Sequence, residues 1–232
     1  MARGEEISLT WYDIGEPLLI HTQPNAVPGR RYGVCTVLLP ALGARLTHEP
    51  GATPLGARLR ELLLTPEASG AAGTTGITPR AEALLMAADR AEHVALVLEP
   101  ALVGGEWVVT ERYSGSTLAY QGWGRGLPPE ELARLVAWAA GGVSADLSVL
   151  VDVTPETAAA RLGRRHRRGG ADRLERLGPG FATRVREGFL AQAEADPAHW
   201  AVVDGAAEIP ALSARILQAV RERLGEPPVT SR

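Results

Sequence analysis

The sequence predicts an α/β protein with a parallel sheet, because short apolar runs alternate with longer amphipathic stretches. The β-prone runs are EWVVT (106–110), DLSVLVDV (146–153) and WAVVD (200–204). Parallel strands joined by crossover helices are typical of this alternation. With 232 residues and 45% hydrophobic content, the chain is long enough for one sizeable core, so we expect a single domain over residues 1–232.

Helix start and stop signals lie between these strands. Thr78 and Pro79 can cap and open one helix, and Gly141 with Gly142 can end another. The last helix has its apolar residues on one face, which we expect to pack onto the sheet. Helices are predicted over residues 79–102, 130–140, 155–163 and 209–224, and an amphipathic helix is expected after the turn at Pro50 and Gly51.

Composition excludes several classes of protein. The single cysteine, Cys35, cannot form an intramolecular disulfide or a cysteine-based zinc cluster. The formal net charge of −3 argues against general affinity for nucleic acid or anionic membrane. No apolar run is long enough to cross a bilayer, and residues 1–13 lack the order of a signal peptide, so we expect a cytoplasmic protein.

Polar side chains follow the strands, where open α/β sheets bind ligands. Glu111 and Arg112 come directly after the run 106–110, and Asp152 and Asp204 end the next two runs. A surface ion pair is the simpler interpretation of Glu111 and Arg112 alone. The stretch that follows, YSGSTLAYQG (113–122), adds aromatic, hydroxyl and amide groups. A guanidinium can hold a phosphate with two hydrogen bonds, so the combination favours a ligand site.

Met86, Arg90 and His93 share one face of the helix predicted before this site. Taken alone, Met86 would be a core residue and Arg90 a solvated charge. If that helix directs Arg90 toward the same crevice as Arg112, two arginines could bind one phosphate dianion.

The stretch RLGRRHRRGGADRLER (161–176) is rich in arginine. A flexible basic loop and a nucleic-acid patch are alternatives, although interleaved aromatic residues are missing. An arginine-rich lid that closes over phosphates fits better, and His166 is given no role. The arginines are Arg161, Arg164, Arg165, Arg167, Arg168, Arg173 and Arg176.

Five stretches in order resemble the motifs of the thymidylate kinase family, which phosphorylates dTMP to dTDP with ATP and Mg²⁺. The resemblance covers roughly residues 46–205 and implies a five-stranded parallel sheet flanked by helices, of the nucleoside-monophosphate-kinase and P-loop NTPase type. The stretches are THEPGATPLG (47–56), EALLMAADRAEHV (82–94), ERYSGSTLAYQG (111–122), LVDVTPETAAAR (150–161) and ADRLE (171–175).

The resemblance also implies site residues. Arg112 would bind the dTMP phosphate and Arg90 would reach the thymine base, with Met86 where the family stacks an aromatic residue. Glu49 and Glu111 would serve the acceptor and the metal. Thr117, Tyr120 and Gln121 would line the base and sugar. The lid, residues 161–176, would cover the ATP phosphates with Arg161, Arg165, Arg168 and Arg173.

The chain departs from the family pattern in three places. Glu111 replaces an aspartate, and His48 replaces an arginine, which makes an anion contact pH-dependent. Residues 1–45 lack a G-x-x-x-x-G-K-[ST] loop, and all 24 basic residues counted as lysine or arginine are arginines. Two β-prone runs, 17–22 and 32–39, stand there instead.

Two accounts of that N-terminal segment stay open. In one, a different reading frame or start makes the chain a damaged copy of a thymidylate kinase. In the other, the chain is a pseudokinase that binds dTMP and has lost the handling of ATP. A homodimer is a further expectation from the resemblance.

Overall fold

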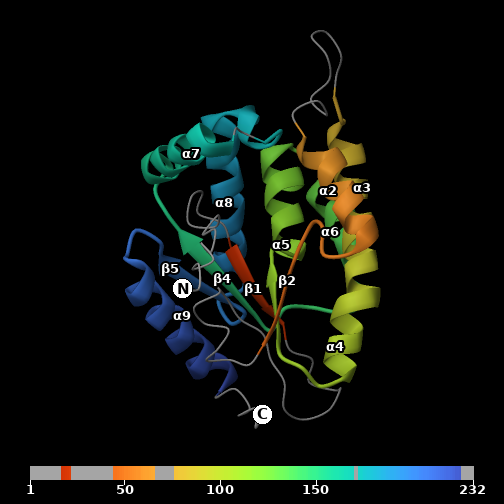
Figure 1. Cartoon of the computed structure of the whole chain (residues 1–232), viewed down its shortest axis with the longest axis vertical. Helices are drawn as coiled ribbons and strands as arrows, with labels where there is room; N and C mark the ends of the chain where they lie inside the picture. Colours follow the sequence, from red (N-terminus) through yellow and green to blue (C-terminus); the bar gives the residue numbers. More distant parts are fainter. Residues whose placement is uncertain (1–16, 22–43, 66–75, 170–171, 226–232) are drawn as a thin grey trace, which may run out of the picture.

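A computed structural model describes residues 17–21, 44–65, 76–169 and 172–225, with side chains described outside 17–21, 164–169 and Ile209. Its centre is a five-stranded sheet with the strand order β2-β3-β1-β4-β5 (Figure 1). The predicted β-prone run 32–39, Cys35 and the tail 226–232 lie outside the described residues. The strands are β1 (Pro17–His21), β2 (Arg45–His48), β3 (Val108–Glu111), β4 (Leu147–Asp152) and β5 (Trp200–Asp204).

The prediction of a wholly parallel sheet is wrong for β1. β2 pairs with β3 in parallel and β4 with β5 in parallel, but β1 is antiparallel to both β3 and β4. A parallel neighbour requires a crossover connection, usually a helix, and the sequence shows no helical pattern before residue 40. The helical crossovers that make β2, β3, β4 and β5 run in one direction therefore do not set the direction of β1.

Four strands nevertheless end at one edge of the sheet. β3 and β4 both run opposite to β1, so β2, β3, β4 and β5 share one direction. The register places His48 opposite Glu111, and Asp152 opposite Asp204. The polar groups predicted to follow the strands therefore do lie along a common edge.

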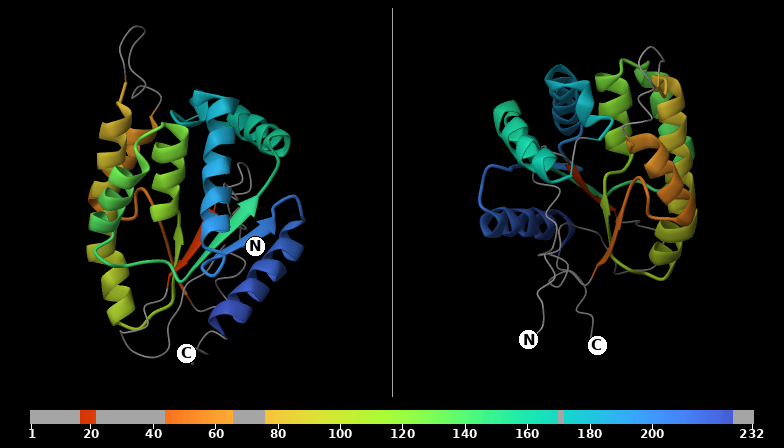
Figure 2. Two further views of the ribbon diagram at one scale, coloured as in Figure 1. Left: turned by 180° about the vertical axis from the view of Figure 1, so that it is seen from behind. Right: turned by 45° about the horizontal axis from the view of Figure 1, so that its top comes forward.

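Helices surround the sheet, as the two views of Figure 2 show. In the part of the chain that the structure describes, α2, α3, α6 and α9 match predicted helices, and α7 continues beyond its predicted end to Gly169. The 17-residue helix α8 was not predicted, and the helix expected over 79–102 continues as α3, a π-helical segment η2 and α4. The helices are α2 (Pro54–Leu64), α3 (Pro79–His93), η2 (Val94–Leu98), α4 (Glu99–Val103), α5 (Ser114–Thr117), η3 (Leu118–Gly124), α6 (Pro129–Ala139), α7 (Pro155–Gly169), η4 (Glu175–Leu177), α8 (Pro179–Ala195) and α9 (Ile209–Leu224).

The core lies between the sheet and these helices. Val108, Val109, Leu147, Val149 and Leu150 are fully buried because both faces of the sheet are covered. The apolar face predicted for the last helix packs onto β4 and β5, as expected. Within the described ranges, no helix combines the length and the apolar character that crossing a bilayer requires.

The turn after β2 leads directly into a capped helix. Thr53 has extended backbone, and its Oγ1 accepts a hydrogen bond from Gly56 N at 2.9 Å. Pro54 occupies the first turn, where a missing N–H costs nothing. This cap fixes residues 49–53 beside the carboxyl end of β2, where the candidate site begins.

Candidate functional site

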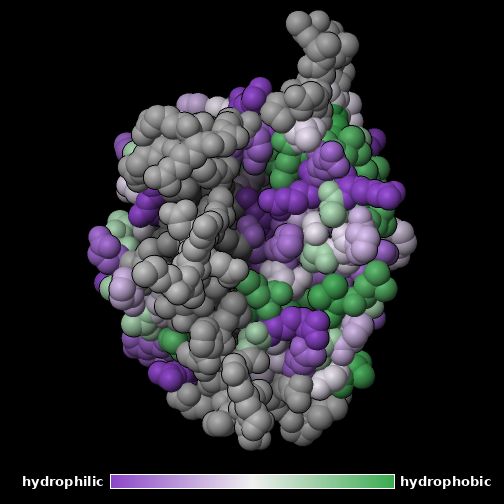
Figure 3. Space-filling model, in the orientation of Figure 1, coloured by the Kyte–Doolittle hydropathy of each residue, from purple (hydrophilic) through white to green (hydrophobic). Residues whose placement is uncertain are grey.

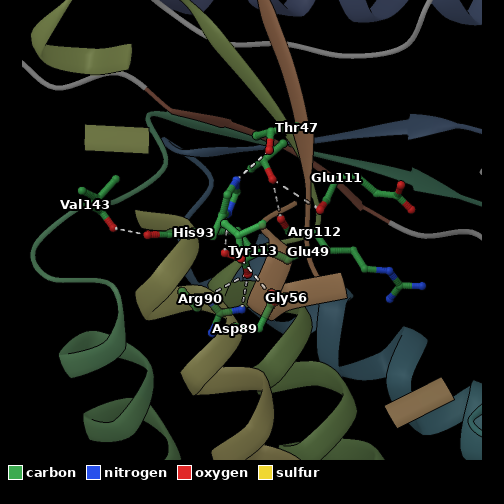
Figure 4. A network of polar contacts seen from close by, with 12 residues as sticks. Thr47, Glu49, Gly56, Asp89, Arg90, His93, Glu111, Arg112, Tyr113 and Val143 are labelled. Carbon is green, nitrogen blue, oxygen red and sulfur yellow. Dashed lines mark hydrogen bonds and ion pairs between the residues drawn. The ribbon is translucent and has the colours of Figure 1, made fainter. Parts of the chain in front are cut away.

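A buried ion network lies where β2 and β3 end (Figure 4). Arg90 reaches Glu49 from α3, with Nε and Nη2 3.0 and 2.8 Å from Glu49 Oε2. His93 Nδ1 lies 2.9 Å from the other oxygen, Oε1, and donates to it because a carboxylate only accepts. All three side chains are buried. Both oxygens of Glu49 are therefore engaged by cationic or N–H donors.

The network stabilises the ionised form of Glu49. Burial alone would raise the pKa of this carboxyl, but the Arg90 charge and the His93 hydrogen bond outweigh burial and hold it below its usual value. His93 Nε2 in turn lies 2.7 Å from Thr47 Oγ1 on β2. The helix α3 is thus tied to β2 and to the residue that follows it by the contacts Arg90–Glu49, Glu49–His93 and His93–Thr47.

A second carboxylate of α3 holds the turn after β2. Asp89 Oδ1 accepts a hydrogen bond from Gly51 N at 2.9 Å, and Gly51 has a φ of 116°, which a residue with a side chain rarely adopts. Burial and the nearby charge of Glu49 raise the pKa of Asp89 to about 6. Burial and the charge of Arg60 lower the pKa of His48 in the same turn. The lowered pKa disfavours the charged form of His48, so His48 is a weaker anion ligand than the arginine of the family pattern.

Arg112 occupies a strained position beyond β3. Its φ is 60°, in the left-handed region that non-glycine residues seldom enter. Thr110 Oγ1 donates to Arg112 O at 3.0 Å and helps to hold this backbone conformation. Strain of this kind is often retained where a side chain must take one direction for function. Here it directs the guanidinium over the ring of Tyr120, 5.0 Å from its centroid.

The two predicted arginines reach adjacent turns of one helical segment. Arg90 Nη1 donates to Thr117 Oγ1 at 3.0 Å, while Arg112 lies over Tyr120, three residues further on. Positions three apart on a helix share a face. Arg90 also lies over the ring of Tyr113, at 5.0 Å. In Figure 3, hydrophilic surface lies in a hollow next to α2, on the face seen in Figure 1.

A separate buried cluster surrounds Glu82. Gln121 Nε2 donates to Glu82 Oε1 at 2.8 Å, and Arg125 donates to both carboxylate oxygens at 3.2 and 2.7 Å. Arg173 Nη2 donates to Glu82 Oε2, and its Nε donates to Leu63 O at 2.6 Å. Gln121, predicted to line the substrate, is thus held by a carboxylate from α3.

The predicted lid arginines have different surroundings. Arg173 is buried and engaged by Glu82 and Leu63, so the guanidinium is not directed outward as a lid arginine would be. Arg161, half-buried on α7, donates to Gly205 O at 3.0 Å. The side chains of Arg165 and Arg168 lie outside the described residues. Arg186 binds both oxygens of Asp152 at 2.6 Å, which ties α8 to the end of β4.

Sequence reasoning missed Glu82, Asp89 and Arg125. A signal existed, because Glu82, Met86, Arg90 and His93 recur at intervals of four, four and three residues along α3 and therefore share a face. Met86 is half-buried, while Glu82, Arg90 and His93 are buried. Charged residues on the inward face of a helix are rarely buried unless they are paired.

Comparison with known proteins identifies the family of the chain. The family model described as thymidylate kinase matches residues 37–216. A thymidylate kinase of Burkholderia vietnamiensis is 42% identical over 171 residues, which cover 74% of this chain and 77% of that protein. A thymidylate kinase of Bifidobacterium longum is 44% identical over 177 residues, covering 76% and 82%. The chain belongs to the thymidylate kinase family.

Proposed function

We propose that the chain binds dTMP at the carboxyl end of β3 and that its reaction is phosphoryl transfer from ATP to dTMP. The observation that carries the proposal is the pair of contacts from Arg90 to Thr117 and from Arg112 to Tyr120, on neighbouring turns. Family membership supports both substrates, because the curated relatives are thymidylate kinases.

Arg112 is the proposed phosphate ligand. It is half-buried, its backbone is fixed by Thr110, and its guanidinium can offer a phosphate two parallel hydrogen bonds. Arg90 donates two hydrogen bonds to Glu49. Because Arg90 is buried, we propose that it acts on the base side of the nucleotide through Thr117, with Met86 further along α3 and with Tyr120 and Gln121 near the sugar.

The residues proposed for Mg²⁺ fit it unequally. Both oxygens of Glu49 are engaged by Arg90 and His93, so Glu49 does not fit as a direct ligand, and we propose that it positions Arg90. Glu111 is half-buried at the end of β3 and has the hard oxygen donors that Mg²⁺ prefers. Mg²⁺ bound with ATP would be held through Glu111 and would offset phosphate charge during transfer.

The ATP phosphates would have to be bound by arginine, because the chain has no lysine to bind them. The sequence contains no lysine, and β1 is antiparallel to both of its neighbours. Arginines of α7, including Arg161, Arg165 and Arg168, are the cations that we propose for the ATP phosphates. Loss of one preorganised donor of this type commonly costs about a hundredfold in rate or more. We therefore expect weak turnover.

A catalytically inactive dTMP-binding protein is the second candidate function. The absence of lysine favours it, because lysine serves the phosphate donor in the family pattern, whereas the residues proposed for dTMP lie on α3, α5 and η3. In that case dTMP binds with Arg112 contributing, and ATP is not consumed. The two functions therefore share the acceptor site and differ only at the donor.

A coupled dTMP/ATP assay, together with calorimetric titration of dTMP, tests both candidates. Kinase activity predicts ADP formation that depends on dTMP and falls in Arg112→Ala. Binding without ADP formation would support the inactive protein. No binding of dTMP to the native chain would overturn the proposed function in both forms.

We also propose that the chain forms a homodimer through its α2 and α3 side. Leu55 and Leu62 on α2 and Leu84 on α3 are 45, 50 and 54% exposed, and these two helices pack together. Exposed apolar residues on neighbouring helices favour a protein contact. Light scattering after gel filtration should give twice the monomer mass of 24.5 kDa, whereas a mass equal to the monomer would contradict the dimer.

A further inference from the structure

Glu82 connects segments that are distant in sequence. It is 0% exposed and accepts hydrogen bonds from Gln121, Arg125 and Arg173, which come from η3, the residue after η3 and the segment after α7. The nearest of these donors in sequence, Gln121, is 39 positions away from it. A buried carboxylate with three side-chain donors is a specific arrangement, because each unpaired partner would be costly.

Glu82 is the anion that offsets the charges of Arg125 and Arg173. Burial alone would raise its pKa, but the hydrogen bonds from Arg125, Gln121 and Arg173 outweigh burial and lower it. One carboxylate thus lies between two guanidinium groups, Arg125 and Arg173. Without Glu82, those two cations would face each other with little water between them. The two segments that carry them are therefore held together by the same anion.

Arg173 fixes the chain after α7 to α2 and α3. Its backbone N–H donates to Leu64 O at 3.0 Å and its Nε to Leu63 O at 2.6 Å, at the end of α2. The neighbouring Asp172 accepts from the N–H groups of Leu174 and Glu175 and so orders the turn. The arginine-bearing helix α7 therefore ends four residues before a firmly held point.

The carboxylate of Glu82 also orders η3, which carries Tyr120 and Gln121, two of the residues proposed to bind dTMP. Gln121 must turn its Nε2 toward Glu82, since a carboxylate cannot donate, and this fixes the direction of the amide. Arg125 packs over the ring of Phe181 at 5.5 Å, and Arg184 donates to Gly124 O, so η3 is also joined to α8. Tyr120, which lies under Arg112, precedes Gln121 directly.

We propose that Glu82 is a positioning residue that couples Gln121 and its neighbours on η3, which are proposed to bind dTMP, to the segment 172–177 that carries Arg173. This inference rests on the proposed function for its ligand, dTMP. The connection that Glu82 makes between 118–125 and 172–177, called the joint below, does not depend on a ligand. Glu82 touches no substrate. Its effect on dTMP passes through Gln121 and Arg125, and its effect on the α7 side passes through Arg173.

Hydrogen exchange of the ligand-free chain tests the joint. Arg173→Gln should raise amide exchange at least tenfold in residues 172–177 and also in 118–125, because the hydrogen bonds of Arg173 go to Leu63, Leu64 and Glu82 and reach 118–125 only through Glu82. Arg173→Lys keeps a cation near Glu82 and should reduce both increases. Arg223→Gln is the matched control, because Arg223 holds another segment through the carbonyls of Pro197, Ala198 and Trp200 and should leave 118–125 unchanged.

Titration with dTMP supplies the second readout. Glu82→Gln and Arg173→Gln should weaken dTMP binding at least fivefold, while Arg223→Gln at a similar loss of thermal stability should change it less than twofold. Increased exchange confined to 172–177, or spread evenly over β4 and α9 as well, would overturn the proposal. Should the native chain not bind dTMP, the proposed function fails, and the exchange pattern alone decides the joint. Should Arg173→Gln not fold, Arg173→Lys should still show the increase in both segments, 172–177 and 118–125, at a smaller amplitude, and an increase in one segment alone would overturn the proposal.

Discussion

Replacing Glu49 by alanine should destabilise the fold strongly. The substitution removes the acceptor of two hydrogen bonds from Arg90, at 3.0 and 2.8 Å, and of one from His93, at 2.9 Å. The side chains of Arg90 and Glu49 are only 3 and 4% exposed, so water cannot take over the lost contacts. Breaking a buried ion pair from one side typically costs about 3–5 kcal/mol. We expect a loss in that range at pH 7.

Urea unfolding followed by tryptophan fluorescence measures this loss, because Trp107 is buried in the core. The matched control is Glu130→Ala, which breaks a pair with Arg134 whose side chains are 87 and 77% exposed. Exposed pairs of this kind contribute only about 0–1 kcal/mol. A Glu49→Ala loss no larger than that of Glu130→Ala would refute the reasoning that the network is closed to water.

The same pair has a defined pH dependence. The pKa of Glu49 is lowered in the folded chain, so its stabilisation is present above the unfolded pKa of about 4.5 and is lost as the pH falls through the folded value. The difference between native and Glu49→Gln chains should therefore shrink below about pH 4.5. A difference that stays constant down to pH 3 would contradict this assignment.

Three further substitutions test the packing around the site. Asp89→Asn keeps an acceptor for Gly51 N, and because the pKa of Asp89 is raised from 3.8 to about 6, the ionised carboxylate lowers the free energy of unfolding above pH 6. In urea unfolding we expect the variant to be about 2–3 kcal/mol more stable than the native chain at pH 8 and equally stable at pH 3.5. An equal gain at both pH values would contradict the raised pKa. Gly56→Ala would place Cβ 2.4 Å from Asp89 Oδ1 and 3.2 Å from Gly51 Cα, so a loss of about 1–3 kcal/mol is expected, and no loss would show that the turn can move aside. Gly188→Ala would place Cβ 2.6 Å from Trp123 Cγ and should lower the melting temperature by several degrees, since α8 and η3 pack closely; an unchanged melting temperature would contradict that packing.

Local patterns predicted the elements of this fold well. Runs of β-branched residues such as VLVDV and WAVVD identified strands β4 and β5, and proline at the helix starts identified α3 and α6. The direction of β1 could not be predicted in the same way. It depends on how the chain reaches the next strand, and residues 22–43 offered no crossover helix, only a turn with proline and asparagine between two β-prone runs.

The candidate site was predictable where side chains follow strands and less so where partners come from far away. Arg112 follows β3 directly, so its place at the sheet edge could be read from sequence order. Arg173 was assigned to the lid with the other arginines, because the sequence of a basic stretch does not show which of its arginines will be buried. Its partner Glu82 lies 91 residues earlier, and only the fold brings the two together.

The central claim is that Arg112 binds the phosphate of dTMP. Calorimetric titration of the native chain and of Arg112→Ala with dTMP and with thymidine, which lacks the phosphate, tests it most directly. We expect the native chain to bind dTMP at least tenfold more tightly than thymidine, and Arg112→Ala to lose most of that preference. An equal preference in both chains would contradict the assignment, because the phosphate would then be bound elsewhere.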